Sequence, residues 1–391
     1  MLVCHSCKRK IVFTAVGLLI FSSCVQIFNP PETTATYNYL VVDGFINAGN
    51  DTTFIRLSRT GPVTDTTQIT PEINANLVIE GTDNSRVPLY ENNPGIYACV
   101  PFNPSNNFQY RLHITTSNGS QYESDYMQPL FAPAIDSLGW INTELGGPAQ
   151  SGVSIYVNTH NVNSSSRYYK WVYYETWEFH PPFESFYPSA YFLNNPGGPP
   201  LDYTALYTCW RTDTSTGIVL GSTFNLSENI ISEIPIVFIP DSSWKLSVEY
   251  SILVQQQMLD ENGYAFFQNL QQNSEELGSI FAPQPGVVSG NMHCLNNPSE
   301  TVIGYVSCSS TTTKRIFIVN NQVTGWYKEP NSCQEWIADQ DDYFLLDENK
   351  LILLQKSYIL PNGDKGASVT DPVCGDCRLS GTSIVPSFWP N

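Results

Sequence analysis

The sequence has few positive charges. Lys and Arg together account for 18 of the 391 residues, against 36 Asp and Glu, which gives a formal net charge of −18. Beyond the amino-terminal segment the basic residues are scattered. Lys314-Arg315 is the one pair of adjacent basic residues there. A surface this acidic repels phosphate backbones. We therefore expect no nucleic-acid partner.

Motifs that carry chemistry are also missing. The sequence has no nucleophile elbow, phosphate-cradling glycine loop or dinucleotide fingerprint. Its histidines do not fall at ligand spacing, and the acidic run 339–342 lacks the glycine and the distal glutamate of a calcium loop. Glu175 and Glu178 are the one carboxylate pair of interest, but strand positions three apart point to opposite faces. We expect no catalytic residue, no metal site and no cofactor.

No apolar run is long enough to span a bilayer. The longest candidate extends from Ile11 to Phe21, follows the basic cluster 8–10 and precedes Ser22-Ser23-Cys24. This order predicts a lipoprotein signal peptide over 1–23, with Cys24 acylated as the mature terminus. Two or three acyl chains would hold the protein stably on a membrane. The alternative is an ordinary secretory signal in which Cys24 is incidental.

Cleavage before Cys24 would remove three basic and no acidic residues, so the formal charge would become −21. Residues 24–37 are polar and contain Pro30-Pro31, and we interpret them as a tether. The folded part should therefore begin near residue 38.

The folded part reads as β-structure. Residues 38–130 hold six or seven short alternating segments separated by polar turns, which is typical of an immunoglobulin-like sandwich. Residues 131–391 predict a larger, mainly-β domain with one embedded helix near 260–278, where Asp260 and Gly263 resemble a cap and apolar residues follow one helical face. A second, short helix fits 333–338. The predicted fold class is all-β, with two domains.

The most unusual stretch is an aromatic segment from Trp177 to Tyr207 that is rich in proline. Proline removes amide donors, so most of this stretch cannot be a ladder strand, and rings on a stiff loop lose little entropy on contact. We expect it to contact a glycan, a small nutrient or a protein, and the candidate binding residues are Trp177, Phe179, Phe183, Phe186, Tyr187, Tyr191 and Phe192. The alternative is that these rings fold back as a lid over the core of the second domain.

Cysteines outside the signal suggest disulfides, as expected in an oxidising compartment. Seven remain after Cys24, and an odd count leaves at least one free or paired with another molecule. The pair Cys374 and Cys377 has the spacing of zinc knuckles and redox sites, but it lies among turns without a second pair, which favours two half-cystines that fasten the C-terminal segment to partners such as Cys333. Candidate disulfide residues are Cys333, Cys374, Cys377, Cys294 and Cys308.

Several phrases in order resemble a known family. They are Leu40-Val41-Val42-Asp43-Gly44, Tyr168-Tyr169-Lys170-Trp171, Cys209-Trp210, the run 278–285 (GSIFAPQP), Gly290-Asn291, Val302-Ile303-Gly304-Tyr305, Lys314-Arg315 and the ending from Cys374 to Trp389. This ordered set is similar to the Bacteroidota lipoprotein family called domain of unknown function 4249. No catalytic or ligand residue is established for that family, so none is transferred.

The resemblance implies an outer-membrane lipoprotein that assists a TonB-dependent transporter by capturing its substrate. We therefore expect a non-enzymatic binding protein, lipid-anchored at the outer membrane on its periplasmic or cell-surface face. A cell-envelope hydrolase is one alternative, which would need convergent carboxylates or histidines in a cleft. A structural or adhesive surface protein is the other, and it would lack a concave site.

Overall fold

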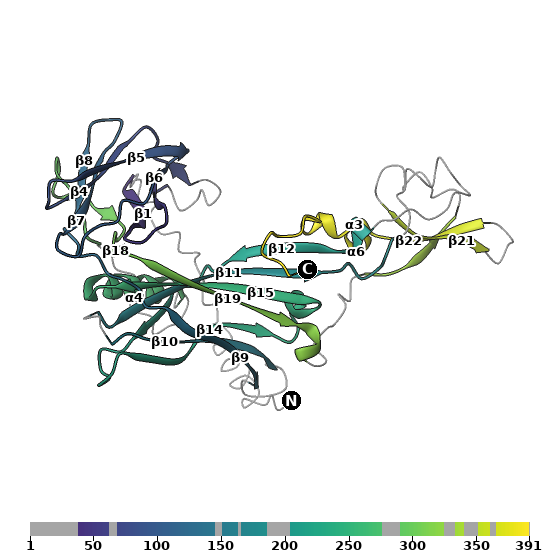
Figure 1. Cartoon of the computed structure of the whole chain (residues 1–391). Helices are drawn as coiled ribbons and strands as arrows, with labels where there is room; N and C mark the ends of the chain where they lie inside the picture. Colours follow the sequence, from purple (N-terminus) through teal and green to yellow (C-terminus); the bar gives the residue numbers. More distant parts are fainter. Residues whose placement is uncertain are drawn as a thin grey trace, which may run out of the picture.

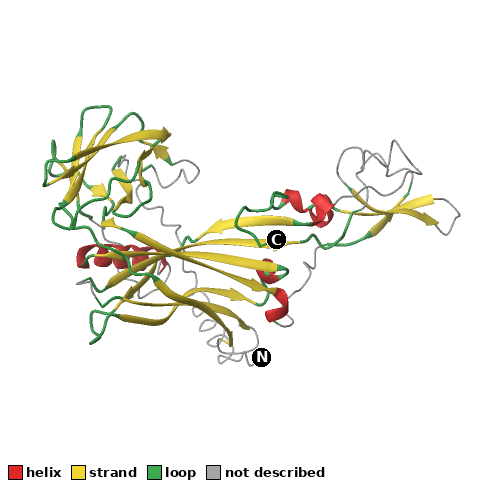
Figure 2. Ribbon diagram, viewed as in Figure 1, coloured by secondary structure: helices red, strands yellow, loops and turns green. Residues whose placement is uncertain are grey.

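A computed structural model describes most of the chain after the expected tether. The described residues are 38–61, 69–144, 151–162, 166–185, 204–275, 290–323, 333–339, 351–359, 365–390. The signal peptide, Cys24 and the tether thus lie outside the described residues. Strands dominate the structure, as the sequence predicts (Figure 2).

The first unit is a β-sandwich that forms a lobe of its own in Figure 1. Its consecutive strands are β1 (Leu40–Asn47), β2 (Thr53–Arg59), β3 (Thr70–Pro71), β4 (Asn76–Gly81), β5 (Arg86–Asn93), β6 (Ile96–Cys99), β7 (Tyr110–Thr115) and β8 (Gln121–Ser124). β4, β7 and β8 form one antiparallel layer and β1, β2 and β6 form the other, while β5 pairs with both β4 and β6. The β-sandwich expected from the sequence is confirmed, as a nearly closed sheet.

Period-2 alternation builds the core of this sandwich. In β7, Tyr110, Leu112 and Ile114 are buried while the residues between them are half-buried. Alternate residues of a strand face opposite sides of a sheet, so one side of each layer supplies the apolar interior and the other remains available to solvent.

The sandwich is completed by a segment from much later in the chain. Its strands are β16 (Met292–Cys294), β17 (Val302–Ile303) and β18 (Cys308–Ser309). β16 pairs antiparallel with β8, whereas β17 and β18 pair parallel with β1. Asn291 joins the two ends of this segment. Its side chain donates to the Val306 carbonyl at 2.8 Å and accepts from the Val306 amide at 2.9 Å. The sandwich therefore extends beyond the contiguous range 38–130.

The central unit packs two sheets face to face. One contains β14 (Ile230–Pro240), β10 (Ser151–His160) and β9 (Ile135–Glu144), and the other contains β12 (Cys209–Thr214), β11 (Tyr168–Phe179), β15 (Glu249–Leu259) and β19 (Thr311–Val319), with β13 (Val219–Ser222) beside β11. Trp171 is fully buried between the sheets, and its indole donates to Gln256 Oε1 at 2.9 Å. The 3₁₀ turns are η2 (Trp244–Leu246) and η3 (Asn320–Gln322).

One long helix lies against this unit, as the sequence predicts. α4 (Glu261–Glu275) begins after Asp260, whose Oδ1 accepts the Gly263 amide at 2.9 Å. A carboxylate in this position satisfies an otherwise unpartnered amide of the first turn. Among the described residues no helix has the length and apolar character needed to cross a membrane.

A further, three-stranded sheet projects away from the body (Figure 1). It contains β20 (Trp336–Ala338), β22 (Lys365–Thr370) and β21 (Ile352–Ile359), and the nearby helical turns are α3 (Thr204–Tyr207), α6 (Pro372–Gly375) and η5 (Cys377–Leu379). The prediction of a short helix over 333–338 is therefore wrong. Trp336–Ala338 instead pairs with β22, because an isolated turn of helix is unstable and strand pairing satisfies the backbone of so short a segment.

Two disulfides attach the C-terminal segment, Cys209–Cys377 and Cys333–Cys374. The interpretation of the 374–377 pair as two separate half-cystines is confirmed, since each sulfur joins a different partner. The assignment of Cys294 and Cys308 to disulfides is wrong.

Cys294 and Cys308 are free thiols within the sandwich core, as is Cys99. They stand on β16 and β18, which pair with different strands of the sandwich. Burial raises the pKa of the Cys308 thiol to about 12. A thiol packed among apolar groups behaves as a small hydrophobe rather than as a reactive group.

Candidate ligand-binding cleft

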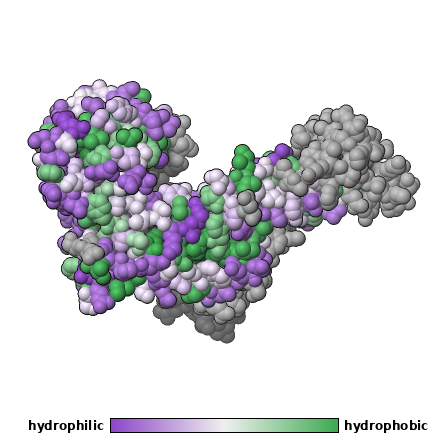
Figure 3. Space-filling model, in the orientation of Figure 1, coloured by the Kyte–Doolittle hydropathy of each residue, from purple (hydrophilic) through white to green (hydrophobic). Residues whose placement is uncertain are grey.

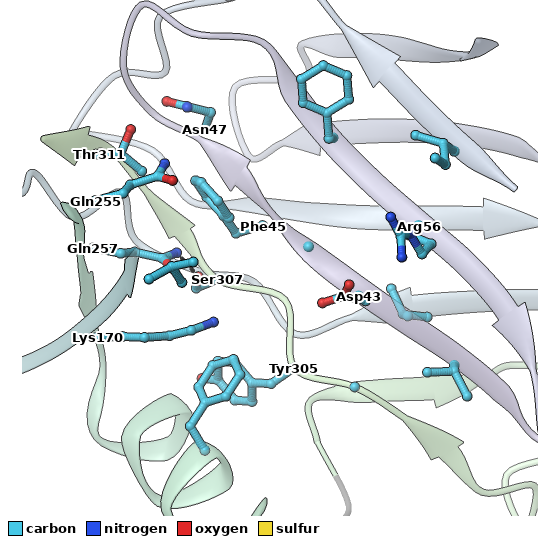
Figure 4. Close-up of a pocket in the computed structure, with 18 of the residues that line it drawn as sticks. Asp43, Phe45, Asn47, Arg56, Lys170, Gln255, Gln257, Tyr305, Ser307 and Thr311 are labelled. Atoms are coloured by element: carbon cyan, nitrogen blue, oxygen red, sulfur yellow. Dashed lines mark hydrogen bonds between the residues drawn. The ribbon is translucent and has the colours of Figure 1, made fainter. Parts of the chain in front are cut away.

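A cleft of about 1180 Å³ lies between the sandwich and the central unit. One wall is the outer face of β1 and β2, and the opposite wall is formed by β11, β15 and α4 (Figure 4). In the space-filling view the sandwich is a rounded lobe above one end of the elongated central unit, and its surface mixes hydrophilic and hydrophobic residues (Figure 3).

Strand alternation supplies the side chains of both walls. On β1, Val42 and Ile46 enter the sandwich core while Asp43 and Phe45 line the cleft. On β11 the odd-numbered Trp171 belongs to the other core, whereas the lining residues are the even-numbered Lys170, Val172 and Tyr174. The cleft is therefore the meeting of two outward sheet faces, neither of which is a core.

Close backbone approach fixes the back of the cleft. Gly304 has φ of +136°, and a Cβ there would lie 2.0 Å from the Val42 carbonyl oxygen. Gly44 on β1 has φ of +134°, and its Cβ would lie 2.4 Å from the Phe54 carbonyl oxygen. Only glycine allows this conformation without strain, so these two positions let segment 303–307 and β2 pack directly against β1.

Polar contacts join the central sheet to the same segment. The buried Gln257 on β15 donates from Nε2 to Ser307 Oγ at 2.8 Å. The Met258 amide donates to Ser309 Oγ at 3.3 Å. These bonds connect strands of both units, which makes the cleft a defined feature of the fold.

Lys170 is the most distinctive group in the cleft. Its ammonium lies 3.8 Å from the centre of the Phe267 ring on α4. Burial lowers the pKa of Lys170 to about 8, and the charge of Asp43 on the opposite wall opposes this shift only in part. Among the described residues no carboxylate forms an ion pair with Lys170.

Aromatic rings stand beside this lysine. Phe266 and Tyr305 are buried, with ring centres 5.7 Å apart. Tyr305 Oη lies 2.7 Å from each carboxylate oxygen of Asp260, and burial first, then this carboxylate, raises the pKa of Tyr305 far above its usual value. Asp260 thus positions both the start of α4 and the aromatic wall of the cleft.

The remaining lining supplies amides, hydroxyls and one more cation. Gln255 and Thr311 lie along the central wall, while Asn47 and Arg56 lie on the sandwich wall (Figure 4). Rings, amides and a few charges are the usual lining of a binding site that orients a polar ligand with apolar parts. Within the described part of the lining there is no histidine or cysteine.

The residues expected to bind from the sequence lie elsewhere. Trp177 and Phe179 are 2% and 1% exposed and belong to the central core, so their assignment to a contact surface is wrong. Both occupy odd positions of β11, and those positions face the second sheet. Phe183 is half-buried, and its amide donates to the Cys374 carbonyl at 3.0 Å. Phe186, Tyr187, Tyr191 and Phe192 lie outside the described residues.

Sequence reasoning missed the cleft residues, although one signal was present. Lys170, Val172 and Tyr174 alternate with buried aromatics in the 168–179 run, which marks them as the outward face of the same strand. Lys170 is the one lysine on the outward face of this strand, which is otherwise rich in aromatic and apolar residues. Its partners come from β1 and α4, which no local pattern connects to it.

One carboxylate cluster lies away from the cleft, on the sandwich. Glu80, His113 and Glu123 come from neighbouring strands and have ligand atoms within 4.8 Å of one another. Arg111 forms ion pairs with both glutamates, including one of 2.8 Å to Glu80. This cluster therefore already has its counter-charge.

The chain matches the model of a known protein family. A family model described as "Domain of unknown function (DUF4249)" matches residues 26–315. The chain belongs to the DUF4249 family. All of the residues that line the cleft lie inside the matched DUF4249 region, while the β20–β22 sheet lies beyond it.

Other comparisons add little to the family assignment. No curated protein matches this DUF4249 chain. A solved structure of trypsin-activated alpha-2-macroglobulin from Escherichia coli is similar at 12% identity over 58% of this chain, with a TM-score of 0.18. The match spans 15% of that structure's chain, and so low a TM-score carries no argument.

Proposed function

We propose that this DUF4249 protein is a non-enzymatic lipoprotein of the Bacteroidota outer membrane that captures a ligand for a TonB-dependent transporter. The observation that carries this proposal is the cleft of about 1180 Å³ between the sandwich and the central unit. It is concave, it is formed by two units, and it combines rings with polar groups, all of which are usual for binding sites.

Placement at a membrane rests on Cys24. The basic cluster, the short apolar run and the small residues before this cysteine support acylation of its sulfur. The anchor would keep the cleft near the transporter and raise the effective concentration of captured ligand there.

Binding is favoured over catalysis by the groups that line the cleft. The carboxylates among them are Asp43 and Asp51, and both are exposed. Neither forms a hydrogen-bonded pair with a base or a second acid among the described residues, whereas a hydrolase needs such convergence. A cell-envelope hydrolase therefore stays the weaker alternative. A purely structural or adhesive role is disfavoured because the molecule has a concave site.

Affinity purification from detergent-solubilised membranes tests the partner and the anchor together. Wild-type protein should fractionate with membranes, incorporate palmitate and co-purify a TonB-dependent receptor. Cys24→Ala should lose the label and the membrane fraction. Equal labelling of both proteins, or recovery of wild type without any receptor, would contradict the proposal.

A further inference from the structure

Lys170 presents an ammonium charge to the cleft, and among the described residues no carboxylate lies within ion-pair distance of it; the charge of Asp43 acts on it from the opposite wall. Its strongest described contact is the Phe267 ring at 3.8 Å. A cation over an aromatic face gains about 0.5–2 kcal/mol, less than the cost of removing an ammonium from water. A group in this position is stabilised further by any anion that enters the cleft.

The other charges in the cleft are arranged differently. Asp43 and Arg56 are register partners on the neighbouring strands β1 and β2, so the sandwich wall carries a negative and a positive charge side by side. Asp51 lies at the exposed turn that follows β1. Lys170 has no such neighbour on its own wall, where the lining residues near it are neutral.

We propose that Lys170 binds a carboxylate of the captured ligand, and that the ligand is an oligomer with apolar groups next to that carboxylate. This inference rests on the proposed capture function and adds the chemical class of the ligand. Phe266, Phe267 and Tyr305 receive the apolar part beside the charge. Gln255 and Thr311 offer both donors and acceptors to its polar groups.

Cleft volume supports an oligomer over a single small unit. Drug-sized ligands occupy sites of about 300–1,000 Å³. At about 1180 Å³ this cleft exceeds that range. A peptide with a free C-terminal carboxylate has both features, because an apolar side chain can lie next to its charge. An oligosaccharide of uronic acids shares only the carboxylate, and the test distinguishes the two.

Calorimetric titration of the folded lipoprotein without its acyl chains distinguishes the sources. One arm uses a hexapeptide library with free C-termini and the same library amidated. The other arm uses oligogalacturonates and their methyl esters. Each arm is repeated with Lys170→Met, and with Arg86→Gln as a control. That control removes one positive charge from a residue outside the cleft lining, whose side chain is 65% exposed and pairs with Glu80.

In the peptide arm the free carboxylate form should bind about ten- to a hundredfold more tightly than its amidated form, the range expected for a hydrogen bond to a charged group. Lys170→Met should abolish this preference and Arg86→Gln should keep it. A preference found only with the oligogalacturonates would overturn the assignment of apolar groups beside the carboxylate. Equal binding of acid and neutral forms would overturn the carboxylate assignment while capture itself stands. Absence of binding in all four titrations would also overturn the assignment, and the proposed function would then be decided by receptor co-purification.

Discussion

The Tyr305 hydroxyl lies 2.7 Å from each carboxylate oxygen of Asp260. This contact joins segment 303–307, which packs on the sandwich, to the first turn of α4. Tyr305 follows β17, which pairs with β1, while Asp260 follows β15 and caps the helix. One hydrogen-bonded pair thus connects the two units at the wall of the cleft. Its removal should affect both stability and binding.

Tyr305→Phe should lower the free energy of unfolding by about 1–3 kcal/mol, because a buried hydrogen bond to a charged group is lost and Asp260 keeps only its helix contact. Chemical denaturation measures the loss. Tyr90→Phe is the matched control, since Tyr90 is 70% exposed and its change should stay within about 0.5 kcal/mol. Equal effects of the two substitutions would contradict the bridging role.

Lys170→Met should stabilise the protein at pH 7 by about 1 kcal/mol, a value reduced for partial exposure of the lysine. In the folded state the pKa of Lys170 is lowered to about 8, so the charged form costs stability below that pH. As pH rises from 8 toward the unfolded value near 10.5, wild type recovers this cost and the difference between the proteins should disappear. Thermal unfolding at pH 7 and pH 10 tests this, and a pH-independent difference would refute it.

Lys245→Met should lower the free energy of unfolding, in contrast to Lys170→Met. Lys245 Nζ lies 2.6 Å from Glu175, which is 4% exposed and also accepts a hydrogen bond from Tyr250 at 2.7 Å. Removal of one partner leaves a buried carboxylate without its counter-charge, which costs about 3–5 kcal/mol. Denaturant unfolding of this variant beside Lys170→Met compares an ion-paired lysine with an unpaired one in the same protein. Stabilisation by Lys245→Met would contradict the structure.

Peptide mapping without reduction should recover Cys209 linked to Cys377 and Cys333 linked to Cys374. Cys99, Cys294 and Cys308 should react with an alkylating reagent only after unfolding, because all three thiols are buried. A 374–377 disulfide, or one equivalent of bound zinc, would contradict this arrangement.

Local patterns in the sequence predict much of the fold. Alternation identifies strands such as Tyr110–Thr115, and the Asp260 cap with an apolar helical face identifies α4. A strand is predicted over 301–307, where β17 lies, but β18 escapes prediction because a two-residue strand contains no period. Their parallel pairing with β1 depends on a chain return of more than 250 residues, which only the assembled fold reveals.

The candidate site was harder to predict, and the aromatic run of β11 shows why. Aromatic residues occupy both faces of that strand, so composition alone does not separate Trp177 in the core from Tyr174 in the cleft. The partners of Lys170 stand on β1 and α4, far away in sequence. A site made between two outward sheet faces leaves no spacing motif.

Native mass spectrometry of the protein isolated from its own membrane tests ligand capture most directly. Gln255→Trp places an indole in the cleft, and Ile141→Trp adds the same bulk to β9, where Ile141 is 53% exposed and outside the cleft lining. Wild type and Ile141→Trp should each carry one bound ligand of the same mass, and Gln255→Trp should carry none. Retention of that ligand by Gln255→Trp, or its absence from wild type, would contradict capture in this cleft.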